Sequence, residues 1–332
     1  MSDDTASVPP AIMVGGAAVA AGERAEISIP IGRLVTGERM SLPVMVLNGA
    51  RPGPTVWING AIHGDEIGGV EIITRVLRTL DPTTMAGTVL AVPVVNVHGF
   101  VTSDRYLPDR RDLNRSFPGS ASGSLGAQVA NLFMNEIVAR CGIGIDLHTG
   151  SDHRTNLPQI RADLDDAATR HLAEEFGTPV VIHARTRDGS LRHAATKAGA
   201  TVLLYEAGEA SRFDEEAIRV GVTGVLRVFA AIGLIDAVVE PAPQPLVSRR
   251  TSWMRARRSG IVHLDIEPGA LVRRRQELGT IDDTFGNRLA VLRAPFDGLV
   301  IGMTRHPLVN RGDAMVHIAE IETAEPAASP AM

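Results

Sequence analysis

The sequence predicts an α/β fold in which a sheet is flanked by helices and is followed by a smaller all-β region. From residue 55 onward, short apolar runs alternate with longer segments of helical spacing, as in parallel sheets covered by helices on both faces. Beyond residue 245 the helical spacing ends, and short apolar segments are separated by turns such as Pro268-Gly269 and Asp297-Gly298. With 332 residues, 44% of them hydrophobic and 21% charged, the chain has enough apolar material for a large core.

The elements of the main region follow from these runs in order. Strands are expected at residues 55–62, 88–95, 143–147, 179–183 and 201–205, and helices at residues 66–80, 125–140, 165–176 and 214–234. The first helix ends where Asp81 and Pro82 follow it. Residues 96–124 are rich in Arg, Asp, Pro and Gly and are too long for a simple connection, so we expect them to serve function.

Prolines in residues 241–245 mark a stiff linker between the region with alternating strand and helix patterns and the region with strand patterns alone. Residues 294–319 resemble the half-barrels of biotinyl and lipoyl carrier domains, which predicts a barrel-sandwich-like domain. No lysine stands where a carrier would be modified, so we expect a wall or lid, with Trp253 packed inside it. The expected division is a flexible tail at 1–25, a main domain at 26–240, a β-rich domain at 246–320 and a flexible tail at 321–332.

Charge and cysteine content exclude several classes of function. The net charge is −5, so no basic face for nucleic acid or an anionic membrane is expected. The single cysteine, Cys141, excludes an intrachain disulfide and a cysteine-rich zinc site, and any metal must be held by His and carboxylate groups. The apolar run 11–21 follows Asp3 and Asp4 rather than basic residues, and no run reaches the length of a membrane span. We therefore expect a cytoplasmic enzyme.

Chemically useful side chains gather at the ends of predicted strands. His63 and Glu66 follow the first strand, His148 follows the strand at 143–147, and Glu206 follows the strand at 201–205. Strand ends of an open α/β sheet meet at one crevice. Two histidines and one carboxylate are a common ligand set of catalytic zinc, so the sequence predicts a metal site. A lone His-x-x-Glu motif is weak evidence for a metal site, because both residue types also occur in structural roles.

Four motifs in order resemble the succinylglutamate desuccinylase and aspartoacylase family of the zinc carboxypeptidase clan. They are His63-Gly64-Asp65-Glu66, the segment Arg-Arg-Asp-Leu-Asn-Arg-Ser-Phe-Pro-Gly at 110–119, Asp146-Leu147-His148 and Tyr205-Glu206. The resemblance covers roughly residues 25 to 320. It implies a carboxypeptidase-like mixed sheet flanked by helices, a zinc hydrolase domain at 26–240, and hydrolysis of the amide bond of an N-acyl amino acid.

The resemblance also implies roles for the residues at the strand ends. His63, Glu66 and His148 would hold one Zn²⁺ per chain. Glu206 would take a proton from the attacking water and pass it to the leaving amine. Glu209 is the alternative for this proton transfer, although it lies beyond the strand end.

Residues of the long polar loop receive roles in the same way. Asn114 and Arg115 match the pair that binds a substrate carboxylate, a task that suits the fork of a guanidinium group. Asp112 would lie behind His63 and fix its ring. Arg161, outside this loop, is a candidate for binding the second polar end of the substrate.

One arginine of this loop should polarise the scissile carbonyl group. Arg105, Arg110 and Arg111 all lie within reach by sequence, and we favour Arg105. The opposing interpretation is that most arginines of a charged loop form surface ion pairs of little consequence.

Two other functions compete with a deacylase. A metallocarboxypeptidase that trims peptides or poly-amino-acid chains would share the zinc and the base. A catalytically inactive binding module would keep the fold, although every chemical position is filled here by a competent residue. The expected partner is a small N-acyl amino acid rather than nucleic acid or a membrane, and assembly into a homo-oligomer is left open.

Overall fold

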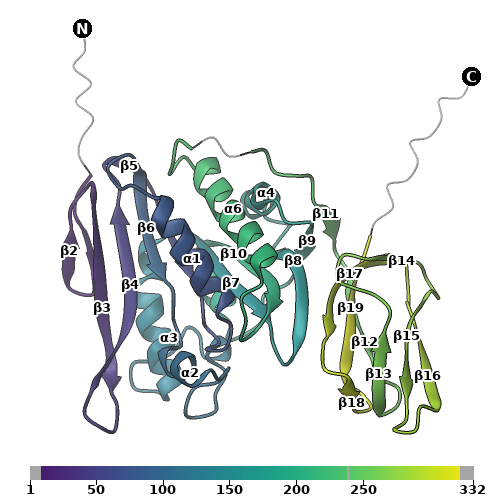
Figure 1. The fold of residues 1–332 in the computed structure, drawn as a ribbon. Helices are drawn as coiled ribbons and strands as arrows, with labels where there is room; N and C mark the ends of the chain where they lie inside the picture. The colour runs from purple at the N-terminus through teal and green to yellow at the C-terminus, as the bar shows by residue number, and fades with distance from the viewer. Residues whose placement is uncertain (1–8, 238–239, 322–332) are drawn as a thin grey trace, which may run out of the picture.

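One mixed sheet runs through the computed structural model, which describes residues 9–237 and 240–321 (Figure 1). Its strands follow one another in the order β12-β19-β17-β8-β10-β7-β5-β6-β4-β3. In that order they comprise Thr251–Arg255, Ala314–Glu320, Gly298–Thr304, Arg154–Ala162, Thr201–Glu209, Ile143–Gly150, Arg51–Asn59, Ala86–Val92, Arg39–Asn48 and Glu23–Arg33. Strands β10, β7, β5 and β6 are parallel to one another, whereas β8, β4 and β3 pair antiparallel with their neighbours. The mixed sheet confirms the expected fold class.

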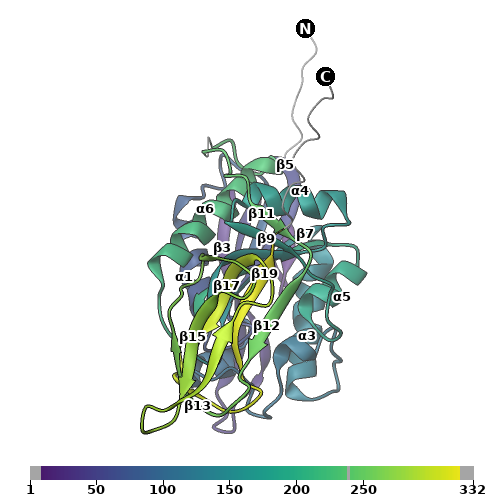
Figure 2. The same ribbon diagram turned by 90° about the vertical axis from the view of Figure 1, so that its right-hand side faces the viewer.

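Helices cover both faces of this sheet. They are α1 (Gly68–Thr79), α2 (Val97–Thr102), α3 (Leu125–Glu136), α4 (Ala167–Phe176), α5 (Leu191–Lys197) and α6 (Glu215–Ala231), with 3-10 turns η1 (Leu113–Arg115) and η2 (Val138–Arg140). Side chains of α1, α4 and α6 pack on one face, and those of α3 and α5 pack on the other (Figure 2). None of the described helices has the length and apolar character needed to cross a membrane.

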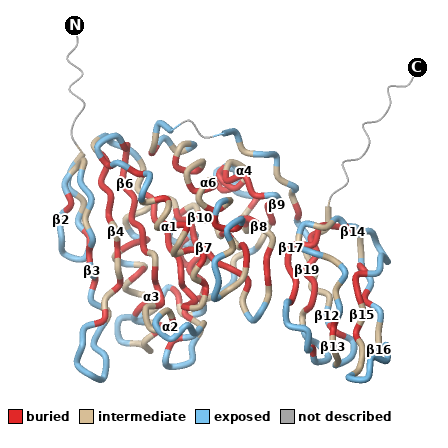
Figure 3. The backbone as a smooth tube through the Cα atoms, viewed as in Figure 1, coloured by how far each residue is buried: buried red, intermediate tan, exposed pale blue. Residues whose placement is uncertain are grey.

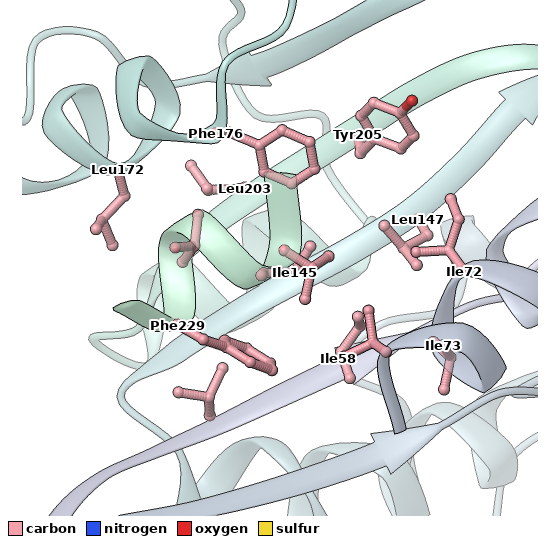
Figure 4. Close-up of a cluster of buried hydrophobic side chains, with 14 of the residues drawn as sticks. Ile58, Ile72, Ile73, Ile145, Leu147, Leu172, Phe176, Leu203, Tyr205 and Phe229 are labelled. Atoms are coloured by element: carbon pink, nitrogen blue, oxygen red, sulfur yellow. The ribbon is translucent and has the colours of Figure 1, made fainter. Parts of the chain in front are cut away.

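The core beneath α1, α4 and α6 determines which side chains of β7 and β10 point to this face of the sheet and which point to the opposite face. Ile145 and Leu147 of β7 and Leu203 and Tyr205 of β10 all point into this core (Figure 4). Because side chains alternate along a strand, the intervening residues of β7 and β10 face the α3 and α5 side. His148 and Glu206 belong to this second set, which places them together at the carboxyl ends of two adjacent strands.

The element boundaries differ from the sequence expectation at the points that matter for function. Strand β5 ends at Asn59 rather than at residue 62, and α1 begins at Gly68 rather than at residue 66. Residues 60–67 are therefore a turn, and His63 and Glu66 lie on it. Strands β8, β4 and β3 were not expected.

The expectation of a flexible tail at residues 1–25 is wrong for its second half. Residues 12–25 contain β1 (Ile12–Val14), β2 (Ala17–Val19) and the start of β3, because Val14 and Val19 are buried in the core beneath α3. Residues 1–8 and 322–332, which make up most of the remainder of the two expected tails, lie outside the described residues.

The region after residue 245 consists of strands and turns, as expected. Besides β12, β17 and β19 it holds β11 (Leu246–Ser248), β13 (Gly260–Leu264), β14 (Leu271–Val272), β15 (Glu277–Asp282), β16 (Arg288–Arg293) and β18 (Leu308–Val309). Strands β16, β15, β13 and β18 form a separate sheet of four strands, which packs with β17 and β19 around a buried core (Figure 3).

The C-terminal region is nevertheless joined to the main sheet. Strand β17 pairs antiparallel with the first half of β8, with Gly302 opposite Asn156. Gln159 Nε2 also donates a hydrogen bond of 3.0 Å to the carbonyl oxygen of Ile301. The second half of β8 pairs instead with β9 (Val180–His183), which in turn pairs with β11. A single sheet therefore connects the two regions across the proline-rich linker.

Candidate active site

The turn after β5 brings His63 and Glu66 to the edge of the sheet. Ala61 has a φ of 46°, a left-handed conformation that is unusual for a residue with a side chain. Its carbonyl oxygen accepts a hydrogen bond of 2.9 Å from the backbone nitrogen of Asn96, which fixes the turn. At Gly64 a Cβ atom would lie 2.0 Å from the backbone of Gly99, so the chains approach closely only because this residue has no side chain.

Three buried side chains converge at this point. Glu66 Oε1 lies 2.7 Å from His63 Nδ1, and Glu66 Oε2 lies 2.8 Å from His148 Nδ1. The three side chains are at most 5% exposed. One ligand atom of each lies within 4.8 Å of the others, so the group could hold a metal ion.

Each imidazole has a carboxylate on its outer side. His63 Nε2 lies 3.2 Å from Asp112 Oδ1, the position that the resemblance implied. His148 Nε2 lies 3.1 Å from Asp146 Oδ2, a contact that the sequence analysis missed. The signal was present, because Asp146 stands two residues before His148 and so faces the same side of β7. Both rings are thus oriented with Nδ1 toward the common centre.

A buried polar chain supports Asp146 from behind. Asn59 Nδ2 donates a hydrogen bond of 2.7 Å to Asp146 Oδ1, and Trp57 Nε1 donates one of 2.9 Å to Asn59 Oδ1. All three side chains are fully buried. The orientation of the second imidazole therefore rests on residues of two neighbouring strands.

The electrostatics of the centre favour a cation. Burial would raise the pKa of Glu66, but the charges of His63 and His148 hold that pKa well below its usual range. Burial would lower the pKa of His148, but the charges of Asp146 and Glu66 raise that pKa well above its usual range. The carboxylates of Glu66, Asp146 and Asp112 surround the two imidazole rings. This set of nitrogen and oxygen donors fits a divalent metal ion.

A cavity of about 400 Å³ opens beside the centre. Glu206 lines it from β10, directly opposite His148 of β7 in the strand register. Asn156 Nδ2 donates a hydrogen bond of 2.7 Å to Glu206 Oε2. Glu209, the alternative base, does not line this cavity and lies 3.7 Å from Arg212 in an ion pair.

Of the three candidate arginines, Arg105 is the one at the cavity. Its Nη1 donates a hydrogen bond of 2.9 Å to Glu66 Oε1, and its Nη2 lies 3.5 Å from Asp112 Oδ2. Arg110 and Arg111 are exposed and do not line the cavity.

The other predicted binding residues also line this cavity. Asn114 Oδ1 accepts a hydrogen bond of 2.9 Å from the backbone nitrogen of Leu191, which leaves its amide NH₂ group as a donor. Arg115 lies beside it, and Arg161 reaches the cavity from β8. The structure thus brings together every site residue that the sequence predicted.

Several lining residues escaped the sequence analysis. Arg185, Arg187 and Arg192 come from the segment after β9, where three arginines within eight residues were a readable signal. Trp253 of β12 also lines the cavity, and it stacks on His317 with ring centroids 4.4 Å apart. The C-terminal region therefore contributes directly to the cavity wall, whereas Trp253 was expected only to pack within its own domain.

Comparison with known proteins identifies the family. The model of the succinylglutamate desuccinylase/aspartoacylase catalytic domain matches residues 52–232, more than half of the chain. The chain belongs to this family. The resemblance inferred from the four motifs is thereby confirmed, and membership indicates a hydrolase of the deacylase type.

One curated protein and several solved structures match most of the chain. An N-alpha-acetyl-L-2,4-diaminobutyric acid deacetylase of Halomonas elongata is 26% identical over 294 residues, 84% of this chain and 86% of that protein. A succinylglutamate desuccinylase/aspartoacylase structure from Rhodobacter sphaeroides is 28% identical, with a TM-score of 0.80 over 90% of this chain and 96% of the other. The product-bound ectoine utilization protein of Ruegeria pomeroyi, 22% identical, shares the fold with a TM-score of 0.80 over 90% and 94% of the two chains.

Proposed function

We propose that this protein is a zinc-dependent amidohydrolase that removes the acyl group from an N-acyl amino acid. The observation that carries the proposal is the convergence of His63, Glu66 and His148 beside Glu206, at the edge of the sheet where β5, β7 and β10 end. The relative from Halomonas elongata, named as a deacetylase of an N-acetylated amino acid, supports the same reaction class. His63, Glu66 and His148 would hold one zinc ion per chain.

Different residues of the chain would contribute to different steps of amide hydrolysis. When bound, zinc supplies a Lewis acid that makes water more acidic and polarises the substrate carbonyl group. Glu206 accepts the proton of the attacking water and passes it to the nitrogen of the leaving amine. Asn156, through its hydrogen bond to Oε2, holds the Glu206 carboxylate toward the cavity.

Cationic and amide side chains position the substrate. Arg105 lies beside Glu66 and would donate to the carbonyl oxygen, on which negative charge develops during attack. Arg115 and the amide NH₂ group of Asn114 would bind the α-carboxylate, and the paired donors of a guanidinium group match the two oxygens.

The dimensions of the cavity favour a small substrate over a peptide. Its volume of about 400 Å³ is within the range of small-molecule sites, and Trp253 of the C-terminal region forms part of its wall. A long peptide chain would have to pass this wall. The deacylase therefore fits the cavity better than the competing carboxypeptidase.

The test is a hydrolysis screen with zinc-loaded protein. N-acetyl, N-succinyl and N-formyl amino acids should be cleaved, and a four-residue peptide with the same terminal residue should be cleaved more slowly. Glu206→Gln should keep its zinc and lose about 100-fold or more in turnover. Glu209→Gln is the matched control and should keep normal turnover. Preference for the peptide would favour the carboxypeptidase, and loss of activity only in Glu209→Gln would move the proton transfer to that residue.

A further inference from the structure

The loop of residues 184–190, between β9 and α5, forms part of the cavity wall. It contributes four lining residues, Ala184, Arg185, Arg187 and Ser190. At its start, the backbone nitrogen of Ala184 donates a hydrogen bond of 2.9 Å to the carbonyl oxygen of Ala162. At its end, Ser190 caps α5, because its hydroxyl oxygen accepts a hydrogen bond of 3.2 Å from the backbone nitrogen of His193. Both ends of the 184–190 loop are therefore fixed.

The same loop packs directly on the two residues proposed to bind the substrate carboxylate. The backbone nitrogen of Phe117 donates a hydrogen bond of 2.9 Å to the carbonyl oxygen of Gly189. Gly189 has a φ of 77°, and a Cβ atom on it would lie 2.7 Å from the carbonyl oxygen of Arg115. Directly after the loop, the backbone nitrogen of Leu191 donates to Asn114 Oδ1 and so fixes this side-chain amide. Residues 189–191 thus contact both Asn114 and Arg115.

One imidazole ring holds the 184–190 loop against α5. His193 Nδ1 lies 3.0 Å from Thr186 Oγ1, at hydrogen-bonding distance, and His193 Nε2 lies 3.6 Å from Asp188 Oδ1. Asp188 is fully exposed, so the second contact contributes little and the contact with Thr186 is the one that constrains the loop. His193 is not among the residues that line the cavity. Any effect of His193 on a substrate must therefore pass through the loop.

We infer that His193 and Gly189 are positioning residues for substrate binding. His193 keeps the 184–190 loop folded through Thr186, and Gly189 allows the folded loop to lie against Arg115. The loop in turn fixes the direction in which Asn114 and Arg115 present their donors to the cavity. This inference rests on the carboxylate-binding role proposed for these two residues.

The inference separates binding from bond cleavage. The metal-binding residues and Glu206 lie on other elements, namely the turn after β5 and the strands β7 and β10. Loosening the 184–190 loop should therefore weaken substrate binding and leave the chemical step unchanged. In kinetic terms, KM should rise while kcat stays close to its value in the parent.

Substitutions of His193 separate its two ring nitrogens. Asn places an amide group where Nδ1 lies and can keep the contact with Thr186, whereas Gln places its amide nearer to Nε2. With zinc-loaded protein and N-acetylalanine as substrate, His193→Gln should raise KM by about 3- to 10-fold, the scale of one hydrogen bond, with kcat within about 2-fold. His193→Asn should restore the KM of the parent.

The partner residue and a second histidine supply the controls. Thr186→Val removes only the hydroxyl group, so it should raise KM as His193→Gln does, and the double variant should be no worse than either single one. His171 is an exposed histidine of α4, and His171→Gln should leave KM and kcat unchanged. An unchanged KM in His193→Gln, or a loss confined to kcat, would overturn the role of His193.

Gly189→Ala tests the close approach to Arg115. The added Cβ atom would meet backbone rather than a flexible side chain, so KM should rise by about 10-fold or more. Alanine is also strained by the positive φ, and the control must carry the same strain. Gly199, just beyond the other end of α5, has a φ of 97°, and its Cβ would meet no described residue within 4 Å. Gly199→Ala should therefore keep the KM of the parent. Equal KM values in the two variants would overturn the role of Gly189.

Hydrogen exchange tests the inference without turnover. The amide hydrogens of Phe117 and Leu191 form the two hydrogen bonds that join the loop region to residues 114–117. Peptides that contain them should exchange faster in His193→Gln and Gly189→Ala, and at the rate of the parent in His193→Asn and Gly199→Ala. Unchanged exchange in both His193→Gln and Gly189→Ala would overturn the inference whatever the activity.

Binding separates this inference from the proposed function. Calorimetric titration of the zinc-loaded protein with N-acetylalanine should show weaker binding to His193→Gln and Gly189→Ala than to the parent. If binding weakens and exchange rises but no N-acyl amino acid is hydrolysed by the parent, the positioning role stands and the proposed function fails. If hydrolysis occurs but KM and exchange are the same in parent and variants, the proposed function stands and the positioning role is rejected.

Discussion

Asn156 and Glu206 are joined by a hydrogen bond of 2.7 Å between the amide nitrogen of Asn156 and Oε2 of Glu206. The other side of Asn156 is in contact with the C-terminal region. A Cβ atom added to Gly302 of β17 would lie 2.6 Å from Asn156 Oδ1. The position of the proposed proton-transfer group therefore depends on a strand from the far end of the chain.

Gly302→Ala should disturb turnover from outside the cavity. The added methyl group displaces Asn156, so Glu206 loses its fixed orientation and kcat should fall by about 10-fold or more, the effect of losing an outer partner of a functional group. KM and zinc content should change little. Gly32→Ala is the matched control, because its Cβ would meet nothing within 4 Å. A kcat equal to that of the parent would show that Asn156 does not position Glu206.

The carboxylate behind His148 should govern zinc affinity. Asp146→Asn removes the charge 3.1 Å from Nε2, and affinity should fall by about 10- to 100-fold in a chelator competition. His148→Ala should remove the metal almost completely. Asp165→Asn, in the exposed group of Asp163, Asp165 and His183, should leave affinity unchanged. Unchanged zinc affinity in Asp146→Asn would mean that this carboxylate does not influence zinc binding by His148.

Arg115 should bind the substrate carboxylate with two parallel hydrogen bonds. Arg115→Lys keeps the charge but loses the fork, so the binding free energy should weaken by roughly 1 to 3 kcal/mol. A substrate with an amidated carboxylate should bind weakly to the parent and no more weakly to the variant. Equal weakening of both substrates, measured by inhibition with non-hydrolysable analogues, would exclude this role.

His317 should make stability depend on pH. Burial, and then the charge of Arg161, lower the pKa of this residue to about 3, so it stays neutral in the folded protein. The unfolded chain takes up a proton below about pH 6.5, and stability is therefore lost as pH falls from there toward 3, by up to about 1.4 kcal/mol per pH unit.

His317→Phe should remove this loss. The phenyl ring can keep the stack on Trp253, and Nδ1 of His317 has no hydrogen-bond partner to lose among the described residues. Urea unfolding of the parent and the variant between pH 5 and 7 measures how steeply the free energy of unfolding changes with pH in each protein. Identical slopes would show that His317 is not held neutral.

The proposed metal ligands could be located from the sequence because they stand at or just beyond the ends of apolar strands, and strand ends meet at one edge of the sheet. Strand β4 was not predicted, although its sequence gave a signal, since Met40, Leu42, Val44 and Val46 alternate with less buried residues. Strand β8 gave no such signal, because Gln159 and Arg161 interrupt its apolar pattern and are accommodated by the cavity and by β17. The placement of Arg192 near Arg161, which is 31 positions away in the chain, could be found only from the three-dimensional structure.

The pairing of β8 with β17 has a consequence for protein synthesis. Gln159 and its partner Ile301 are 142 positions apart. At the usual rate of about 5 to 20 residues per second, a ribosome needs roughly 7 to 28 seconds to bridge that interval. During this time the first half of β8 lacks its neighbour β17, and an unpaired strand edge promotes aggregation. A nascent chain stalled within this interval should therefore associate with chaperones and have no activity.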